Sequence, residues 1–347
     1  SNDNSISDDQ RQVVRATIYK EYFTKVILPN HVKTDEVSYK TVIDNYKNFL
    51  NIWNDITNKR ANRLLTKQMN VFTTNIDTLI EKASEEVQVE LNDGFKGSIN
   101  QVFNEGNFQK SYSKTSLHFQ NISEIPVFNL LKMHGSINWN NEGNIISNDY
   151  KLNAVHNTNT ELQKIDSKFF VECADISAMS TNSVKIIADE SFDKNLFNSF
   201  FKQYENLIIV NPTKQKFVES VIELHFYELM RIYSNSLEKE NSMLFVMGFS
   251  FADEHIAKIT LRAANTNPTL LIVIFAFNDE QEIKYKEILK PTPNNNILII
   301  TPTKFREANK EDDIKKEKIS KIVQFDLATV NLVFEIINSE IPINYGK

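Results

Sequence analysis

Short apolar runs alternate with amphipathic segments along most of this chain. We interpret six of the runs as strands, at residues 70–75, 128–133, 207–210, 242–247, 269–277 and 297–300. Several are followed by segments with helical spacing of apolar residues, such as 216–239, 253–264 and 325–337. Uninterrupted apolar strands are typical of parallel sheets that are buried on both faces. The alternation therefore predicts an α/β fold with a Rossmann-like parallel sheet and flanking helices.

Three parts are predicted along the chain. Residues 1–65 form an N-terminal helical region, since apolar residues recur at helical spacing until Pro29 interrupts them and again after it. Residues 66–140 and 205–347 form the Rossmann-like domain. Residues 141–204 are polar, rich in Asn and weakly periodic, and we interpret them as an inserted small accessory module.

The composition argues against several classes of protein. The 347 residues carry a formal net charge of −6, so we expect no nucleic-acid contact through this chain alone. No apolar run approaches the roughly 20 residues of a membrane-spanning helix, and no signal-peptide pattern opens the sequence. The single cysteine, Cys173, cannot form an intrachain disulfide or a multi-cysteine zinc site. We therefore expect a cytoplasmic protein without membrane contact, without zinc and without another metal site.

Polar side chains gather where the predicted strands end. One strand ends in Thr74-Asn75-Ile76-Asp77, a second in His134-Gly135-Ser136 and a third in Gly248-Phe249-Ser250, while Asn211 follows a fourth. In open α/β sheets, ligands bind beyond the carboxyl ends of the strands. An amide, a carboxylate, an imidazole and a Gly-Ser turn at one sheet edge would suit a dinucleotide.

Each of these residues also has a simpler explanation when it is considered alone. Asn75 and Asp77 would then be helix N-cap residues, His134 a capping or core residue, and Gly248 a tight-turn residue. The joint occurrence of the three segments in this order favours a binding site instead. The other histidines show no metal-ligand spacing, and we assign them to the surface or the core.

The three segments together resemble the sirtuin-like superfamily. Thr74-Asn75-Ile76-Asp77 is similar to the sirtuin Thr-Gln-Asn-Ile-Asp element, with Thr74 in the place of Gln. Leu131-Lys132-Met133-His134-Gly135-Ser136 is similar to the Leu-His-Gly element. The segment from Gly248 to Asp253 resembles the Gly-x-Ser-x-x-Asp turn near the end of the fold.

The resemblance implies NAD+ as the substrate and gives each residue a role. Asn75 would order the attacking water or the ribose hydroxyls, and His134 would be the general base near the ribose on the nicotinamide side. Asp77 would hold the nicotinamide carboxamide. Gly248 and Ser250 would contact the adenosine half or its phosphates. The other residues expected to bind NAD+ are Thr74, Gly135, Asn211 and Asp253.

Two departures from the sirtuin pattern refine this expectation. Sirtuin deacetylases carry a four-cysteine zinc module, which a chain with one cysteine cannot build. The absence favours the zinc-free sirtuin-like branch of bacterial antiphage defence, whose members hydrolyse NAD+ to nicotinamide and ADP-ribose and so starve infected cells. The family's Gly-Ala-Gly phosphate loop is also missing, since the first glycine is Gly94. Either the chain begins downstream of that loop, or the pyrophosphate site is degenerate.

The resemblance therefore predicts an NAD+ hydrolase of antiphage defence that forms homo-oligomers and has a HerA-type ATPase as a partner. The alternative is a nucleotide-binding scaffold that regulates, or is regulated by, such an ATPase; the missing Gly-rich loop supports it. A zinc-free deacylase has little support in the sequence. A nuclease has little support either, because no paired-carboxylate metal motif is present.

Overall fold

Two three-stranded parallel sheets form the centre of the protein in a computed structural model. The structure describes residues 7–29, 36–60, 66–118, 122–141, 143, 145–171, 194–210, 220–310 and 316–341. The first sheet has the order β1–β7–β2, with β1 (Gln68–Thr73), β7 (Val127–Lys132) and β2 (Glu90–Asn92). The second has the order β11–β12–β13, with β11 (Met243–Met247), β12 (Leu271–Phe275) and β13 (Ile297–Ile300). The predicted α/β fold with parallel strands is confirmed.

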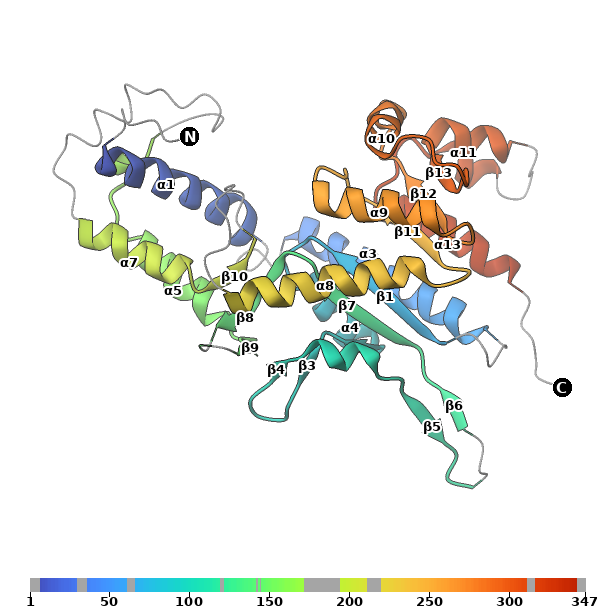
Figure 1. Cartoon of the computed structure of the whole chain (residues 1–347), viewed down its shortest axis with the longest axis horizontal. Coiled ribbons are helices and arrows are strands. Elements are labelled where there is room, and N and C mark those ends of the chain that lie inside the picture. Colours follow the sequence, from blue (N-terminus) through green and yellow to red (C-terminus); the bar gives the residue numbers. More distant parts are fainter. Residues whose placement is uncertain are drawn as a thin grey trace.

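Both sheets share the same two hydrophobic layers. On one face, Leu131 of β7 and Ile272 of β12 pack in one cluster with helices α8 (Ser220–Glu238), α9 (Glu254–Thr266) and α10 (Gln281–Leu289). On the other, Phe128 and Phe275 pack with α3 (Val37–Asn58), α4 (Leu79–Val87) and α13 (Leu327–Glu340). Successive strand residues point to opposite faces, so the two sheets are two parts of one layer between two layers of helices (Figure 1). The short helices α11 (Pro302–Ala308) and α12 (Lys316–Ser320) follow β13.

A second body lies beside this core and holds its own hydrophobic cluster. Its helices are α1 (Asp8–Tyr22), the π-helical turn η1 (Phe23–Ile27), α5 (Asn153–Leu162), the 3-10 turn η3 (Ser167–Phe169) and α7 (Lys194–Tyr204). Tyr19 of α1 stacks on Tyr204 of α7, with ring centroids 4.0 Å apart. A sheet of order β10–β8–β9–β4–β3 reaches from this body to the core, with β3 (Phe95–Lys96), β4 (Val102–Phe103), β8 (Gly135–Asn141), β9 (Ile146–Asn148) and β10 (Leu207–Ile209).

The predicted N-terminal helical region is divided between the two bodies. The apolar stripe of α1 packs against α7, whereas that of α3 packs against α4 and α13. The predicted inserted module supplies α5 and α7, and it shares its core with α1 and β10. The accessory body is thus assembled from two stretches that are far apart in the sequence, one with α1 and η1 and the other with α5, α7 and β10.

The segment between α4 and β7 forms short elements that the sequence did not predict. They include β3, β4, the 3-10 turn η2 (Glu105–Gln109) and a hairpin of β5 (Ser113–Thr115) and β6 (Ile122–Glu124), which projects from the core (Figure 1). Strands of two or three residues are too short to show the alternation that identifies a strand. None of the described helices is long and apolar enough to cross a membrane.

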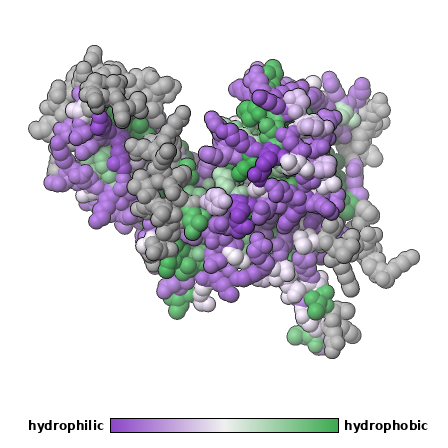
Figure 2. Space-filling model, in the orientation of Figure 1, coloured by the Kyte–Doolittle hydropathy of each residue, from purple (hydrophilic) through white to green (hydrophobic). Residues whose placement is uncertain are grey.

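The carboxyl ends of β1 and β7 face the accessory body, because β7 continues directly into β8 (Figure 1). Figure 2 shows a notch in the molecular surface between the body that holds α1 and α7 and the part of the core that holds α9 and α10. The predicted site residues that follow these strands therefore lie at the junction of the two bodies, the usual position of ligand sites in open α/β sheets.

Candidate functional site

The turn after β1 is anchored at its middle residue. Ile76 is 7% exposed and packs in the core of the accessory body. Its carbonyl oxygen accepts a hydrogen bond from the backbone N–H of Ile137, at 3.0 Å. Thr73 Oγ1 accepts another from the backbone N–H of Asn75, also at 3.0 Å. The side chains of Asn75, which is exposed, and Asp77, which is half-buried, thus flank a fixed residue.

The helix that follows explains only part of this turn. Asp77 Oδ1 accepts a hydrogen bond from the backbone N–H of Leu79, at 3.0 Å, so its carboxylate does support the start of α4. The N-cap residue itself is Thr78, whose side chain makes no capping hydrogen bond. Asn75 lies further from the helix, and its side chain forms a hydrogen bond with Tyr46 of α3. The simple N-cap interpretation therefore fits Asp77 in part and does not account for Asn75.

Tyr46 is a site residue that the sequence analysis missed. Burial, and then the negative charge of Asp77, raise the pKa of Tyr46 to about 12, although its hydrogen bond with Asn75 acts in the opposite direction. The phenol therefore stays protonated and neutral near neutral pH. No motif marked this residue, because it lies on a helix remote in sequence from the turn.

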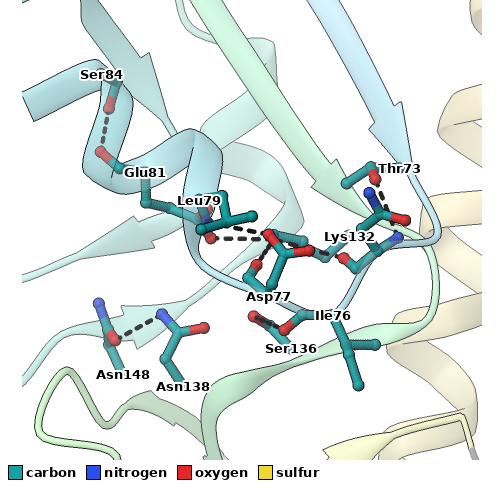
Figure 3. Close-up of polar contacts among 11 residues, drawn as sticks. Thr73, Ile76, Asp77, Leu79, Glu81, Ser84, Lys132, Ser136, Asn138 and Asn148 are labelled. Carbon is teal, nitrogen blue, oxygen red and sulfur yellow. Dashed lines mark hydrogen bonds and ion pairs between the residues drawn. The ribbon is translucent and has the colours of Figure 1, made fainter. Parts of the chain in front are cut away.

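Lys132 lies beneath the turn as a buried cation (Figure 3). It is 3% exposed, and its Nζ donates to the carbonyl oxygen of Asp77 and lies 3.5 Å from that of Asn75. The same Nζ is 3.3 Å from Glu81 Oε1 of α4. Burial raises the pKa of the Glu81 carboxyl, against the opposing effect of Lys132. The sequence signal for Lys132 was the one charged residue of a strand that is otherwise uncharged and mostly apolar.

His134 and Asp253 form a pair that connects the two parallel sheets. His134 follows β7, and its Nε2 is 3.0 Å from Asp253 Oδ2. Asp253 is the N-cap residue of α9, and its Oδ1 accepts the backbone N–H groups of His255 at 2.9 Å and Ile256 at 3.2 Å. Both side chains of the pair are partly exposed, at 25% and 21%. A carboxylate that orients a histidine in this way is a recurrent feature of acid–base sites.

The hydrogen bond with His134, more than the backbone donors, holds the pKa of Asp253 below its usual range, although burial acts in the opposite direction. A lowered pKa stabilises the fold above the ordinary pKa of the carboxyl, and this contribution is lost as pH falls through the lowered value. Replacing His134 with Ala should therefore raise the pKa of Asp253 and move acid unfolding to higher pH. Carbon-13 NMR of the Asp253 carboxyl measures the first effect and circular dichroism the second. An unchanged Asp253 titration in the variant would contradict the assignment.

The two glycines expected to bind NAD+ lie in different surroundings. Gly135 is buried and has φ +74°, and a Cβ added there would lie 2.0 Å from the carbonyl oxygen of Ile208. Gly248 has φ +63° on an exposed turn, and no atom lies within 4 Å of an added Cβ. Ser250 of the same turn is exposed. The backbone at Gly248 and Ser250 is therefore open to a ligand, whereas Gly135 meets a packing requirement between β8 and β10.

The remaining expected residues are placed as follows. Thr74 is half-buried at the end of β1, and Asn211 lies outside the described residues, as does Cys173. Within the described ranges, no three His, Cys, Asp or Glu side chains gather where they could hold a metal ion. The structure thus brings together Asn75 and Asp77 on one turn and His134 with Asp253 on its neighbour.

Comparison with known families agrees with this part of the chain. Residues 69–176 match the model of the SIR2-like domain, a region that includes β1, the Asn75–Asp77 turn, β7 and His134. A comparison with curated proteins gave no match. The match supports a relation of this region to a sirtuin-like family. SIR2-like domains bind NAD+, and the family is generally one of NAD-dependent enzymes.

Proposed function

We propose that this protein is an NAD+ hydrolase that cleaves NAD+ to nicotinamide and ADP-ribose. The observation that carries the proposal is the His134–Asp253 pair, with 3.0 Å between Nε2 and Oδ2, next to the Asn75–Asp77 turn. The match of residues 69–176 to the SIR2-like domain supports NAD+ as the ligand.

The chemistry of the site residues is suited to glycosidic cleavage. Nicotinamide is a good leaving group, so the protein mainly has to orient the ribose and stabilise the positive charge that develops there. The carboxylates of Asp77 and Asp253 supply negative charge at this edge of the sheet. His134, held by Asp253, accepts the proton of the attacking water or ribose hydroxyl. The exposed amide of Asn75 positions that water.

The biological role proposed for this activity is depletion of NAD+ in bacterial antiphage defence. Its support is the resemblance to the zinc-free sirtuin-like branch. A cytoplasmic NAD+ hydrolase is toxic to its own cell and needs a switch, for which we propose homo-oligomerisation or binding of a HerA-type ATPase.

A nucleotide-binding scaffold is the second candidate. Two observations favour it. The turn after β1 contains no glycine, and Gly135, which follows β7, is buried. Close approach of backbone to a pyrophosphate usually depends on glycine at such turns. A scaffold would bind NAD+ or ADP-ribose tightly without consuming it.

The test is consumption of NAD+ by the purified full chain, with nicotinamide and ADP-ribose followed by chromatography. We expect both products to form in equal amounts, either from the chain alone or when a HerA-type ATPase is added. If calorimetry shows that NAD+ binds but no product forms in either condition, the hydrolase proposal is wrong and the scaffold proposal is supported.

A further inference from the structure

We infer that Lys132 is a positioning residue for the Asn75–Asp77 turn, and that its buried ammonium sets the geometry in which the two side chains meet the substrate. The inference rests on the proposed function, because it takes Asn75 and Asp77 as the groups that hold the nicotinamide half of NAD+. It concerns a residue that contacts only the protein.

The geometry makes Lys132 the link between the turn and the strand beneath it. Its Nζ donates to the carbonyl oxygen of Asp77 and lies 3.5 Å from that of Asn75. The carbonyl oxygen of Ile76, which lies between Asn75 and Asp77, accepts a hydrogen bond from Ser136 Oγ at 3.1 Å. All three carbonyl oxygens of the turn therefore face donors from the β7–β8 segment (Figure 3). These contacts fix the backbone of the turn, and with it the positions from which the side chains of Asn75 and Asp77 extend.

The cost of burying this cation indicates that its position matters. Lys132 is 3% exposed, and the only acid that pairs with it among the described residues is Glu81, at 3.3 Å. The second oxygen of Glu81, Oε2, is buried without a hydrogen-bond partner. A buried ion pair with an unsatisfied oxygen contributes little to stability, because well-packed apolar residues in its place often give a protein that is equally stable. A positioning role explains why the pair lies under this particular turn.

The charges around Lys132 are arranged to hold the turn rather than to act on a ligand. Glu81 faces it from α4, Asp77 lies above it, and Tyr46 approaches the same turn from α3. Since Nζ is occupied by carbonyl and carboxylate oxygens, Lys132 can affect the reaction only through the turn. Its removal should lower kcat more than it raises KM, since the contacts expected at Gly248 and Ser250 are untouched.

Hydrogen–deuterium exchange of the ligand-free protein tests the positioning directly. In Lys132→Met, amides of residues 75–78 should exchange about tenfold faster or more, because a charge-assisted hydrogen bond to the turn is lost. The double variant Lys132→Met/Glu81→Gln should show the same change, and it leaves no unpaired buried charge that might unfold the protein. NAD+ hydrolysis by the double variant should fall about 10²-fold in kcat, a typical effect of a small misplacement.

Lys59→Met is the matched control. Lys59 also donates from Nζ to a backbone carbonyl, that of Asn338 at 2.7 Å, but at the far end of α3. The Lys59→Met variant should leave both the amide exchange of residues 75–78 and the rate of NAD+ hydrolysis unchanged. Unaltered exchange at residues 75–78 in both Lys132 variants would overturn the inference, as would faster exchange with unaltered hydrolysis. If the wild type consumes no NAD+ either alone or with a HerA-type ATPase, the proposed function fails, while the exchange result still decides whether Lys132 holds the turn.

Discussion

Replacing His134 with Ala is expected to lower the rate of NAD+ hydrolysis by about 10²–10⁴-fold, the usual contribution of a positioned acid or base. The imidazole is partly exposed at the carboxyl end of β7 and is oriented by Asp253 at 3.0 Å. The neighbouring groups replace it poorly, because the carboxylate of Asp253 is a weaker base than an imidazole and the amide of Asn75 cannot accept a proton near neutral pH. The measurement is the initial rate of nicotinamide release at saturating NAD+.

Two further variants make the result specific to this pair. Asp253→Asn keeps the size of the side chain but removes the charge that orients the imidazole, so hydrolysis should fall as well. His156→Ala removes an exposed histidine of α5 in the accessory body and should hydrolyse NAD+ at the wild-type rate. If His134→Ala retained the wild-type rate while folded, His134 would have no part in the chemistry, and the proposed mechanism would be lost.

The elements around this pair could be predicted from the sequence because their patterns are local. The apolar runs at 70–75, 128–133 and 242–247 correspond to β1, β7 and β11 within two residues at each end. The helix predicted at 253–264 is α9, and its first turn begins at the capping carboxylate of Asp253. By contrast, no helix was predicted where α10 lies, because its apolar residues do not all share one face. Tyr285 is buried, while Ile283 is 65% exposed.

The contacts within the site could not be predicted in the same way. His134 and Asp253 are 119 residues apart, and only the arrangement of the two sheets makes them partners. Tyr46 reaches the turn because α3 packs on the sheet, and Glu81 meets Lys132 because α4 follows the turn directly. Each of these contacts depends on tertiary packing, which residue spacing does not encode.

Gly135 presents the opposite case, a residue that the resemblance assigned to NAD+ and the structure requires for packing. Replacing it with Ala should destabilise the protein by roughly 2–5 kcal/mol, from about 1–2 for a left-handed backbone and about 1–3 for overpacking. Its φ is +74°, and the added Cβ would lie 2.0 Å from the carbonyl oxygen of Ile208, a backbone atom that cannot rotate away. Chemical denaturation, with the free energy of unfolding extrapolated to water, measures the loss.

Gly143→Ala separates the two causes. Gly143 has nearly the same backbone angle, φ +75°, but no atom lies within 4 Å of an added Cβ. It should therefore lose only the cost of the left-handed backbone, about 1–2 kcal/mol. The difference between the two variants is the cost of separating β8 from β10 beside His134. Equal losses would show that the close approach to Ile208 relaxes freely, and the glycine after His134 would then need an explanation other than packing, of which contact with NAD+ is the first to test.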